Sequence, residues 1–161
     1  MFYYRKFLEG DGFLKEKVCC GFGHREVYAA VAEPLRKTLE RLITEQNVCV
    51  FLTGGMGAFD ALFSAAVRQL RLTYPHIRLE LVQPYLTATL QKNKGEYIQI
   101  YDEIVIPDAL DGAHRKAAIP LRNRWMVEQS DVVVSYLRRD FGGAYQAVVY
   151  AQKLKKHIVA L

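Results

Sequence analysis

Long hydrophobic runs are absent from this sequence, and the longest apolar stretches are well short of the roughly 20 residues that a membrane-spanning helix needs. The first residues, Met1–Lys6, are not followed by the apolar core of a signal peptide, because Glu9 and Asp11 interrupt what comes next. We therefore expect no membrane association and a cytoplasmic location.

Cysteine is scarce as well, with three residues, Cys19, Cys20 and Cys49. An odd count without ligand spacing argues against a disulfide framework and against a zinc site, and the four histidines also lack metal-ligand spacing. We expect no metal and three small core cysteines. Neighbouring Cys19 and Cys20 should point to opposite faces of a strand.

The overall composition is that of an ordinary globular protein, with 161 residues, 51% hydrophobic and 24% charged. We expect a single domain over residues 1–161, in which residues 1–16 form a hairpin or an arm. The net charge of +5 suits an anionic partner. This charge does not choose between nucleic acid and a small phosphorylated ligand. The basic residues are not gathered in one block, and we interpret them mainly as solvated surface, with a nucleic-acid patch as the alternative.

Short β-rich runs alternate with longer amphipathic stretches along the chain. Strands are predicted over residues 18–20, 48–52, 78–82, 103–106, 132–136 and 158–161. Helices are predicted in the stretch that contains Pro34 and stops at Asn47, between Phe59 and Tyr74, over 96–101, from Pro120 to Gln129, and from Gly142-Gly143 through Leu154. Residues 84–94 and 108–119 are predicted to be loops. This alternation indicates an α/β fold with a mostly parallel central sheet, helices on both faces, and a ligand site at the carboxyl ends of the strands.

The first loop whose residues suit ligand binding is Gly21–Arg25, between a predicted strand and a helix. Glycines such as Gly23 allow a close backbone approach to an anion, and Arg25 can contact phosphate or carboxylate. As a dinucleotide fingerprint the match is weak, because Glu26 stands where the third glycine belongs. The alternative is a plain turn with a solvated His24 and Arg25.

A second glycine-rich loop, Thr53–Asp60, joins the second strand to the next helix. Its glycines, Gly54, Gly55 and Gly57, suit an anion cradle, although no Walker sequence follows. Asp60, in the first helical turn, either binds ribose hydroxyls or only complements the helix dipole.

The third region pairs Arg122–Met126 with the later Gly142-Gly143. Arg122 and Asn123 should lie beside the strand that leads to Gly142 and Gly143. Trp125 and Met126 are interpreted as core residues, and a solvated helix face is the alternative for Arg122 and Arg124.

Together these segments resemble the SLOG superfamily of SMF/DprA- and LOG-related proteins, and within it the YpsA-like group. The segment Cys19–Arg25 reads CCGFGHR and is similar to that group's CCFTGHR, while Thr53–Asp60 reads TGGMGAFD, like its GGAxGxD. Arg122–Val127, RNRWMV, resembles its RNxxMV segment, and Gly142-Gly143 matches its last glycine pair. The resemblance runs from about Val18 to Leu161.

The resemblance implies a Rossmann-like three-layer sandwich that binds a nucleotide or nucleotide derivative, often as a homo-oligomer. LOG relatives are phosphoribohydrolases with a catalytic Glu after their last glycine loop. Here residues 144–147 read AYQA, without a carboxylate. We therefore expect a non-catalytic binding or sensor protein. The alternative is a nucleotide N-glycosidic hydrolase, and a weaker one is a DprA-like nucleic-acid binder.

The expected partner is a small phosphorylated ligand such as a nucleotide or ADP-ribose. Its phosphate is predicted to lie against the second glycine loop, with an additional contact from Arg25. Asp60 is predicted to bind a sugar hydroxyl. Arg122, Asn123 and Gly143 are predicted to form the opposite wall of the site. No catalytic residue, metal or further cofactor is assigned. The predicted ligand-binding residues are Gly23, Arg25, Gly54, Gly55, Gly57, Asp60, Arg122, Asn123, Gly142 and Gly143.

Overall fold

The computed structural model describes residues 16–161 and contains one sheet of six strands. Every neighbouring pair in it is parallel, in the order β4-β3-β2-β1-β5-β6, so the predicted parallel sheet and Rossmann-like fold are confirmed. The predicted hairpin or arm over residues 1–16 falls, apart from Glu16, outside the described residues. The strands are β1 (Lys17–Gly23), β2 (Val48–Thr53), β3 (Arg78–Val82), β4 (Glu103–Val105), β5 (Val132–Tyr136) and β6 (His157–Ala160).

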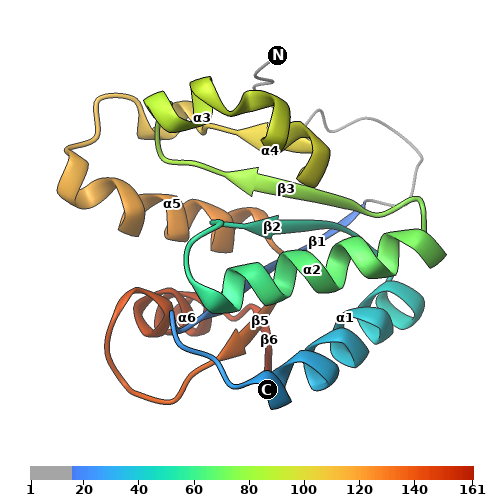
Figure 1. Cartoon of the computed structure of the whole chain (residues 1–161). Coiled ribbons are helices and arrows are strands. Elements are labelled where there is room, and N and C mark those ends of the chain that lie inside the picture. The colour runs from blue at the N-terminus through green and yellow to red at the C-terminus, as the bar shows by residue number, and fades with distance from the viewer. Residues whose placement is uncertain (1–15) are drawn as a thin grey trace, which may run out of the picture.

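Helices cover both faces of this sheet (Figure 1). One face carries α1 (Ala32–Gln46) and α2 (Ala58–Thr73), and the other carries α5 (Arg115–Gln129) and α6 (Gly143–Lys153). The short helices α3 (Ala88–Lys92) and α4 (Lys94–Ile100) pack near β3 and β4, and 3₁₀ turns span Ala29–Val31 and Asp108–Leu110. None of the helices in residues 16–161 combines the length and the apolar character that crossing a membrane requires.

The hydrophobic core is divided by the sheet, as the alternation of side chains along a strand requires. Cys19 and Phe51 are buried with the apolar faces of α1 and α2, whereas Cys20 and Leu52 are buried with α5 and α6. The prediction that Cys19 and Cys20 face opposite sides is therefore confirmed. All three cysteines are buried and unbridged.

Several predicted boundaries are wrong in the second half of the chain. The predicted loop 84–94 contains α3, whose first turn is capped by Thr87 Oγ1 accepting from the Leu90 amide at 3.1 Å. Pro120 does not open its helix: α5 begins at Arg115, inside the predicted loop 108–119, and tolerates an exposed proline in its interior. The last helix was predicted to run through Leu154, but α6 ends at Lys153, and the Leu154 side chain is exposed.

The strand order creates a crevice beside β1. The chain moves from β1 to β2, β3 and β4 on one side, and then crosses to β5 and β6 on the other. In open parallel sheets, ligands bind where the strand order reverses, outside the carboxyl ends of the strands. The carboxyl ends of β1, β2 and β5 carry the three predicted glycine segments.

Candidate functional site

A cavity of about 350 Å³ opens at the carboxyl end of β1, within the range typical of small-molecule sites. Residues from all three predicted segments line it, although these segments are far apart in the sequence. The lining residues are Gly21, Phe22, Gly23, His24, Arg25, Gly54, Met56, Asp60, Ile119, Arg122, Asn123, Arg139, Gly142, Gly143 and Ala144.

Two of the ten predicted residues, Gly55 and Gly57, do not line the cavity. Both have positive φ angles, +67° and +91°, which favour glycine. A Cβ on Gly55 would lie 2.6 Å from Leu81 Cδ1, and one on Gly57 would lie 3.1 Å from Arg25 Cα. These two glycines determine the shape of the loop. A direct contact between them and a phosphate remains a prediction, and neither glycine lines the cavity.

Gly23 lines the cavity, but packing also demands a glycine there. A Cβ at this position would lie 2.2 Å from Cγ of Phe59, a buried residue of α2. The absence of a side chain at Gly23 therefore allows α2 to approach the end of β1 closely.

Arg122 is 3% exposed, so the alternative of a solvated helix face is wrong for this residue. Its Nη1 donates to the carbonyl oxygens of Gly54 (2.9 Å) and Val82 (3.0 Å), and its Nε donates to Asn123 Oδ1 (3.0 Å). The guanidinium lies so close to Gly54 that a Cβ there would come within 2.4 Å of Nη1. Arg122 thus joins α5 to the ends of β2 and β3 and holds the Gly54 loop in place.

Little of the Arg122 guanidinium remains for a ligand. Its Nη2 makes one weak contact, at 3.9 Å, to Met56 Sδ. Burial lowers the pKa of Arg122, and the nearby Asp60 carboxylate opposes that shift. A ligand contact by Arg122, as predicted, would have to use Nη2.

Asp60 is the one carboxylate among the described residues that line the cavity. Burial raises its pKa from an ordinary value of 3.8 to about 6, and the Met56 amide and the Arg122 charge act in the opposite direction. Its Oδ2 accepts a hydrogen bond from the Met56 amide at 2.8 Å, which ties the carboxylate to the glycine loop. Carboxylates with perturbed pKa values in cavities are candidates for functional roles.

We expect Asp60→Asn to stabilise the protein in a pH-dependent way. Because the folded-state pKa is raised, ionisation costs folding free energy as the pH rises through about 4 to 6, and the neutral amide avoids that cost. The amide oxygen can still accept from Met56. Urea unfolding should show a gain of roughly 1–3 kcal/mol above pH 7 and almost none at pH 4.

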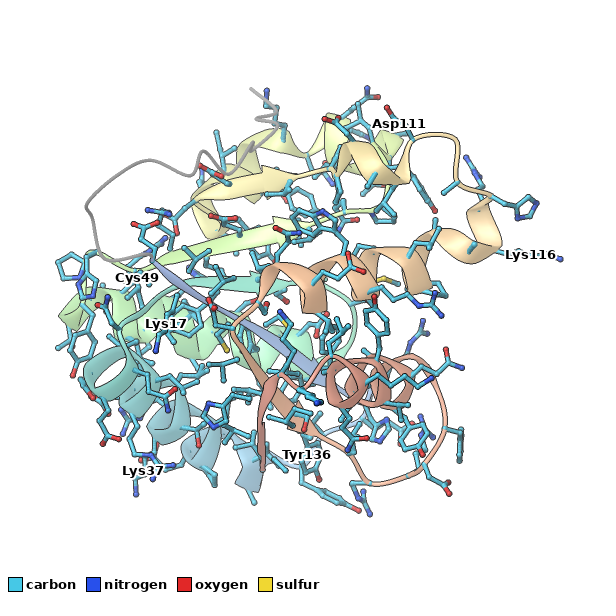
Figure 2. The ribbon with its side chains drawn as sticks, turned by 180° about the vertical axis from the view of Figure 1, so that it is seen from behind. Lys17, Lys37, Cys49, Asp111, Lys116 and Tyr136 are labelled. Atoms are coloured by element: carbon cyan, nitrogen blue, oxygen red, sulfur yellow. The ribbon has the colours of Figure 1, made fainter. Side chains whose placement is uncertain are left out.

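Asp111→Asn is the matched control for this substitution, because Asp111 is exposed on the surface (Figure 2) and does not line the cavity. It should leave the free energy of unfolding nearly unchanged at both pH values. A pH-independent effect of Asp60→Asn would contradict the burial of its charge.

Both helices that begin at the cavity have a glycine N-cap in the same backbone conformation. Gly57 has φ 91° and ψ 177°, Gly142 has φ 93° and ψ 176°, and neither helix has a capping side chain. At the α2 terminus the first amide, that of Ala58, donates to the carbonyl of Arg25 at 3.1 Å, and the Asp60 carboxylate lies in the first turn, where it disfavours a second anion.

The α6 terminus is open. Among the described residues, no acceptor is present for the backbone amides of Gly143, Ala144 and Tyr145, and two of these residues line the cavity. Unpaired amides at a helix N-terminus attract anions. The geometry therefore favours α6 over the Gly54–Gly57 loop as the place for a phosphate.

Of the lining residues that sequence reasoning did not predict, His24 and Arg139 are the two that carry titratable side chains. His24 is 7% exposed, so the alternative of a solvated His24 is wrong, whereas Arg25 is exposed. Burial, with Arg139 and Arg138 nearby, lowers the pKa of His24. Their positions were the available signal, since His24 directly follows β1 and Arg139 lies in the loop that enters α6.

The charges that line the cavity favour an anionic ligand. Three arginines (Arg25, Arg122 and Arg139) face one carboxylate, Asp60. Asp140 is exposed and does not line the cavity, so it supplies no second carboxylate there.

Sequence comparison finds no matching family model. The chain is 25% identical over 136 residues to the SPbeta prophage-derived protein YoqJ of Bacillus subtilis, an alignment that covers 75% of this chain and 80% of YoqJ. It is also 25% identical over 118 residues to the UPF0398 protein BH1768 of Halalkalibacterium halodurans, covering 68% and 62% of the two chains.

Similar folds occur among solved structures. DNA processing protein A of Helicobacter pylori, whose structure concerns single-stranded DNA binding, matches with TM-score 0.62 and 18% identity over 89% of this chain and 64% of that one. DprA of Streptococcus pneumoniae matches with TM-score 0.61 and 17% identity over 91% and 50%. TM1055 matches with TM-score 0.51 and 16% identity over 89% and 72%. The chain therefore spans about half of the pneumococcal protein, and these likenesses concern the fold.

Proposed function

We propose that this chain, which resembles the YpsA-like group of the SLOG superfamily, binds a nucleotide or nucleotide derivative in the cavity at the carboxyl end of β1. The observation that carries the proposal is the open α6 terminus, where Gly143 and Ala144 bring unpaired amides to a cavity that also contains Arg139. Three cations and a helix N-terminus around one carboxylate suit a phosphate beside a neutral, hydroxyl-bearing group.

Each part of such a ligand has a candidate partner. The phosphate accepts from the α6 amides and Arg139, while Arg25 contacts it from the exposed side. Asp60 accepts from a sugar hydroxyl, and Asn123, beside Gly143, contributes its amide.

A thermal-shift screen against nucleoside monophosphates, diphosphates and ADP-ribose tests this proposal. A ligand present at 100 times its dissociation constant should add about 2.7 kcal/mol to the free energy of unfolding. A single-stranded oligonucleotide belongs in the same screen, because a nucleic-acid binder would respond to it with a steep dependence on salt. No shift with any small phosphorylated compound would contradict the proposal.

We expect Arg25→Ala to weaken binding of such a nucleotide by roughly 1.5–3 kcal/mol, the range for hydrogen bonds to charged groups. The fold should be unaffected, since the bond from Ala58 uses the Arg25 backbone and the side chain is exposed. Lys37→Ala is the control, because Lys37 projects from the outer face of α1 (Figure 2). Isothermal titration of both variants measures the difference, and equal losses would indicate a diffuse effect of net charge.

Hydrolysis of an N-glycosidic bond is the second candidate function, and Asp60 is the observation that favours it. Cleavage builds positive charge on the ribose, which a preorganised carboxylate stabilises. The α6 segment lacks the catalytic Glu expected of LOG-type hydrolases. Chromatography of adenosine or cytidine monophosphate incubated with the protein should show little free base; rapid release that Asp60→Asn abolishes would establish the hydrolase instead.

A further inference from the structure

A second cavity, of about 210 Å³, adjoins the first one beside His24. It is lined by His24, Glu26, Arg138 and Arg139, and it shares His24 and Arg139 with the nucleotide cavity. The two spaces therefore meet at these side chains.

His24 has a buried polar atom without a partner. The side chain is 7% exposed, and its Nε2 is completely covered yet makes no hydrogen bond. A buried nitrogen of this kind costs free energy unless a bound group satisfies it. The His24 residue lines both cavities, so a ligand that draws Nε2 out of its cover would supply the missing partner.

The two arginines of this cavity, Arg138 and Arg139, keep their positive charges available for an anion. Over the part of the chain that the structure describes, neither Arg138 nor Arg139 forms an ion pair. Each guanidinium instead lies over an aromatic ring, Arg138 at 4.3 Å from the centroid of Tyr28 and Arg139 at 4.9 Å from that of Phe141. These contacts hold the cations in place without neutralising them.

We propose that this second cavity is an anion subsite, so that the ligand carries a diphosphate whose two phosphates lie on either side of Arg139. This proposal rests on the proposed function, because the first phosphate occupies the α6 terminus. The second phosphate would accept from Arg138 and Arg139, and a rotation of the His24 ring would bring its covered Nε2 within reach as a further donor. Glu26, the one carboxylate among the described residues that line this cavity, would repel the phosphate, but the attraction of the two arginines outweighs this repulsion.

The pKa of the His24 imidazole should show whether a phosphate occupies the second cavity. Burial and the two arginines lower its pKa in the empty protein, and a nearby anion would raise it again. A diphosphate whose own charge does not change over this pH range should therefore bind more tightly as the pH falls. The pKa of His24 also depends on the other charged groups that line the two cavities, which are Arg25, Glu26, Asp60, Arg122, Arg138 and Arg139.

Nuclear magnetic resonance titration with inorganic phosphate and with pyrophosphate, at fixed ionic strength, tests the proposal without assuming a base. Phosphate should shift the amides of Gly143 and Ala144. Pyrophosphate should shift the same amides, bind about tenfold more tightly, and raise the pKa of the His24 imidazole. In Arg138→Ala the tenfold advantage should be lost while the phosphate affinity stays unchanged, and Arg41→Ala, on the exposed side of α1, should behave as wild type.

The outcomes separate the two proposals. If phosphate does not shift the α6 amides, the proposed function fails, and this inference fails with it. If phosphate binds at α6 but pyrophosphate is no tighter, or Arg138→Ala leaves its advantage intact, the second subsite is contradicted while the proposed function stands.

Discussion

Gly143→Asp is expected to abolish binding of a nucleotide while the protein remains folded. The new carboxylate would stand at the first position of α6, where it repels a phosphate and occupies its amides, and we expect a loss of at least about 100-fold. The fold has room for the side chain, since a Cβ at Gly143 would contact only Asn123 Nδ2, at 3.7 Å. An acidic residue in the first helical turn also favours the helix. Isothermal titration measures the affinity, and urea unfolding the stability.

Gly95→Asp provides the matched control, because it adds the same charge in the first turn of α4, where a Cβ meets nothing within 4 Å. Gly95 does not line the cavity, so affinity should stay within about twofold of wild type. Undiminished binding by Gly143→Asp would exclude the α6 terminus as the phosphate site.

Arg122→Met should destabilise the fold more than most single substitutions, by roughly 2–4 kcal/mol. Methionine retains much of the side-chain length but cannot donate to Gly54, Val82 or Asn123, so buried acceptors lose their donors. Gln83 Nε2 still donates to the Gly54 carbonyl at 3.1 Å, which limits the loss there. Denaturant unfolding gives the change in free energy.

Arg124→Met makes the same replacement two residues along α5, where the guanidinium is exposed and lies over the Tyr150 ring. It should cost less than about 1 kcal/mol. Equal stabilities for the two variants would show that Arg122 does not hold the Gly54 loop.

The sheet and the main helices could be predicted because local patterns determine them. Continuous apolar runs such as Val48–Leu52 mark strands that are buried on both faces, and the spacing of Phe59, Phe63 and Val67 marks the inner face of α2. Asn47 was a readable stop signal, and it adopts the left-handed conformation, with φ 58°.

The elements that were missed depend on weaker local signals. The five residues of α3 rest on one capping contact from Thr87, too short a span for hydrophobic periodicity to appear. The start of α5 was misplaced because Pro120 resembles a first-turn residue, whereas the helix is capped by His114, whose Nδ1 accepts from the Lys116 amide at 3.3 Å.

The residues of the site could be gathered from the sequence, but their roles could not. Arg122 was predicted to bind a ligand, and its role in holding the Gly54 loop was missed because its partners, Gly54 and Val82, are 68 and 40 residues away in the chain. The two glycine N-caps, Gly57 and Gly142, are equivalent in sequence terms. Only the structure distinguishes the helix whose first amide is occupied from the one whose amides are open.

A crystal structure with a bound nucleoside diphosphate tests the central claim most directly. The account predicts phosphate oxygens within hydrogen-bonding distance of the amides of Gly143 and Ala144 and of the Arg139 guanidinium, with the sugar toward Asp60. A phosphate seated instead against Gly55 and Gly57, or a ligand outside the cavity at the end of β1, would contradict it.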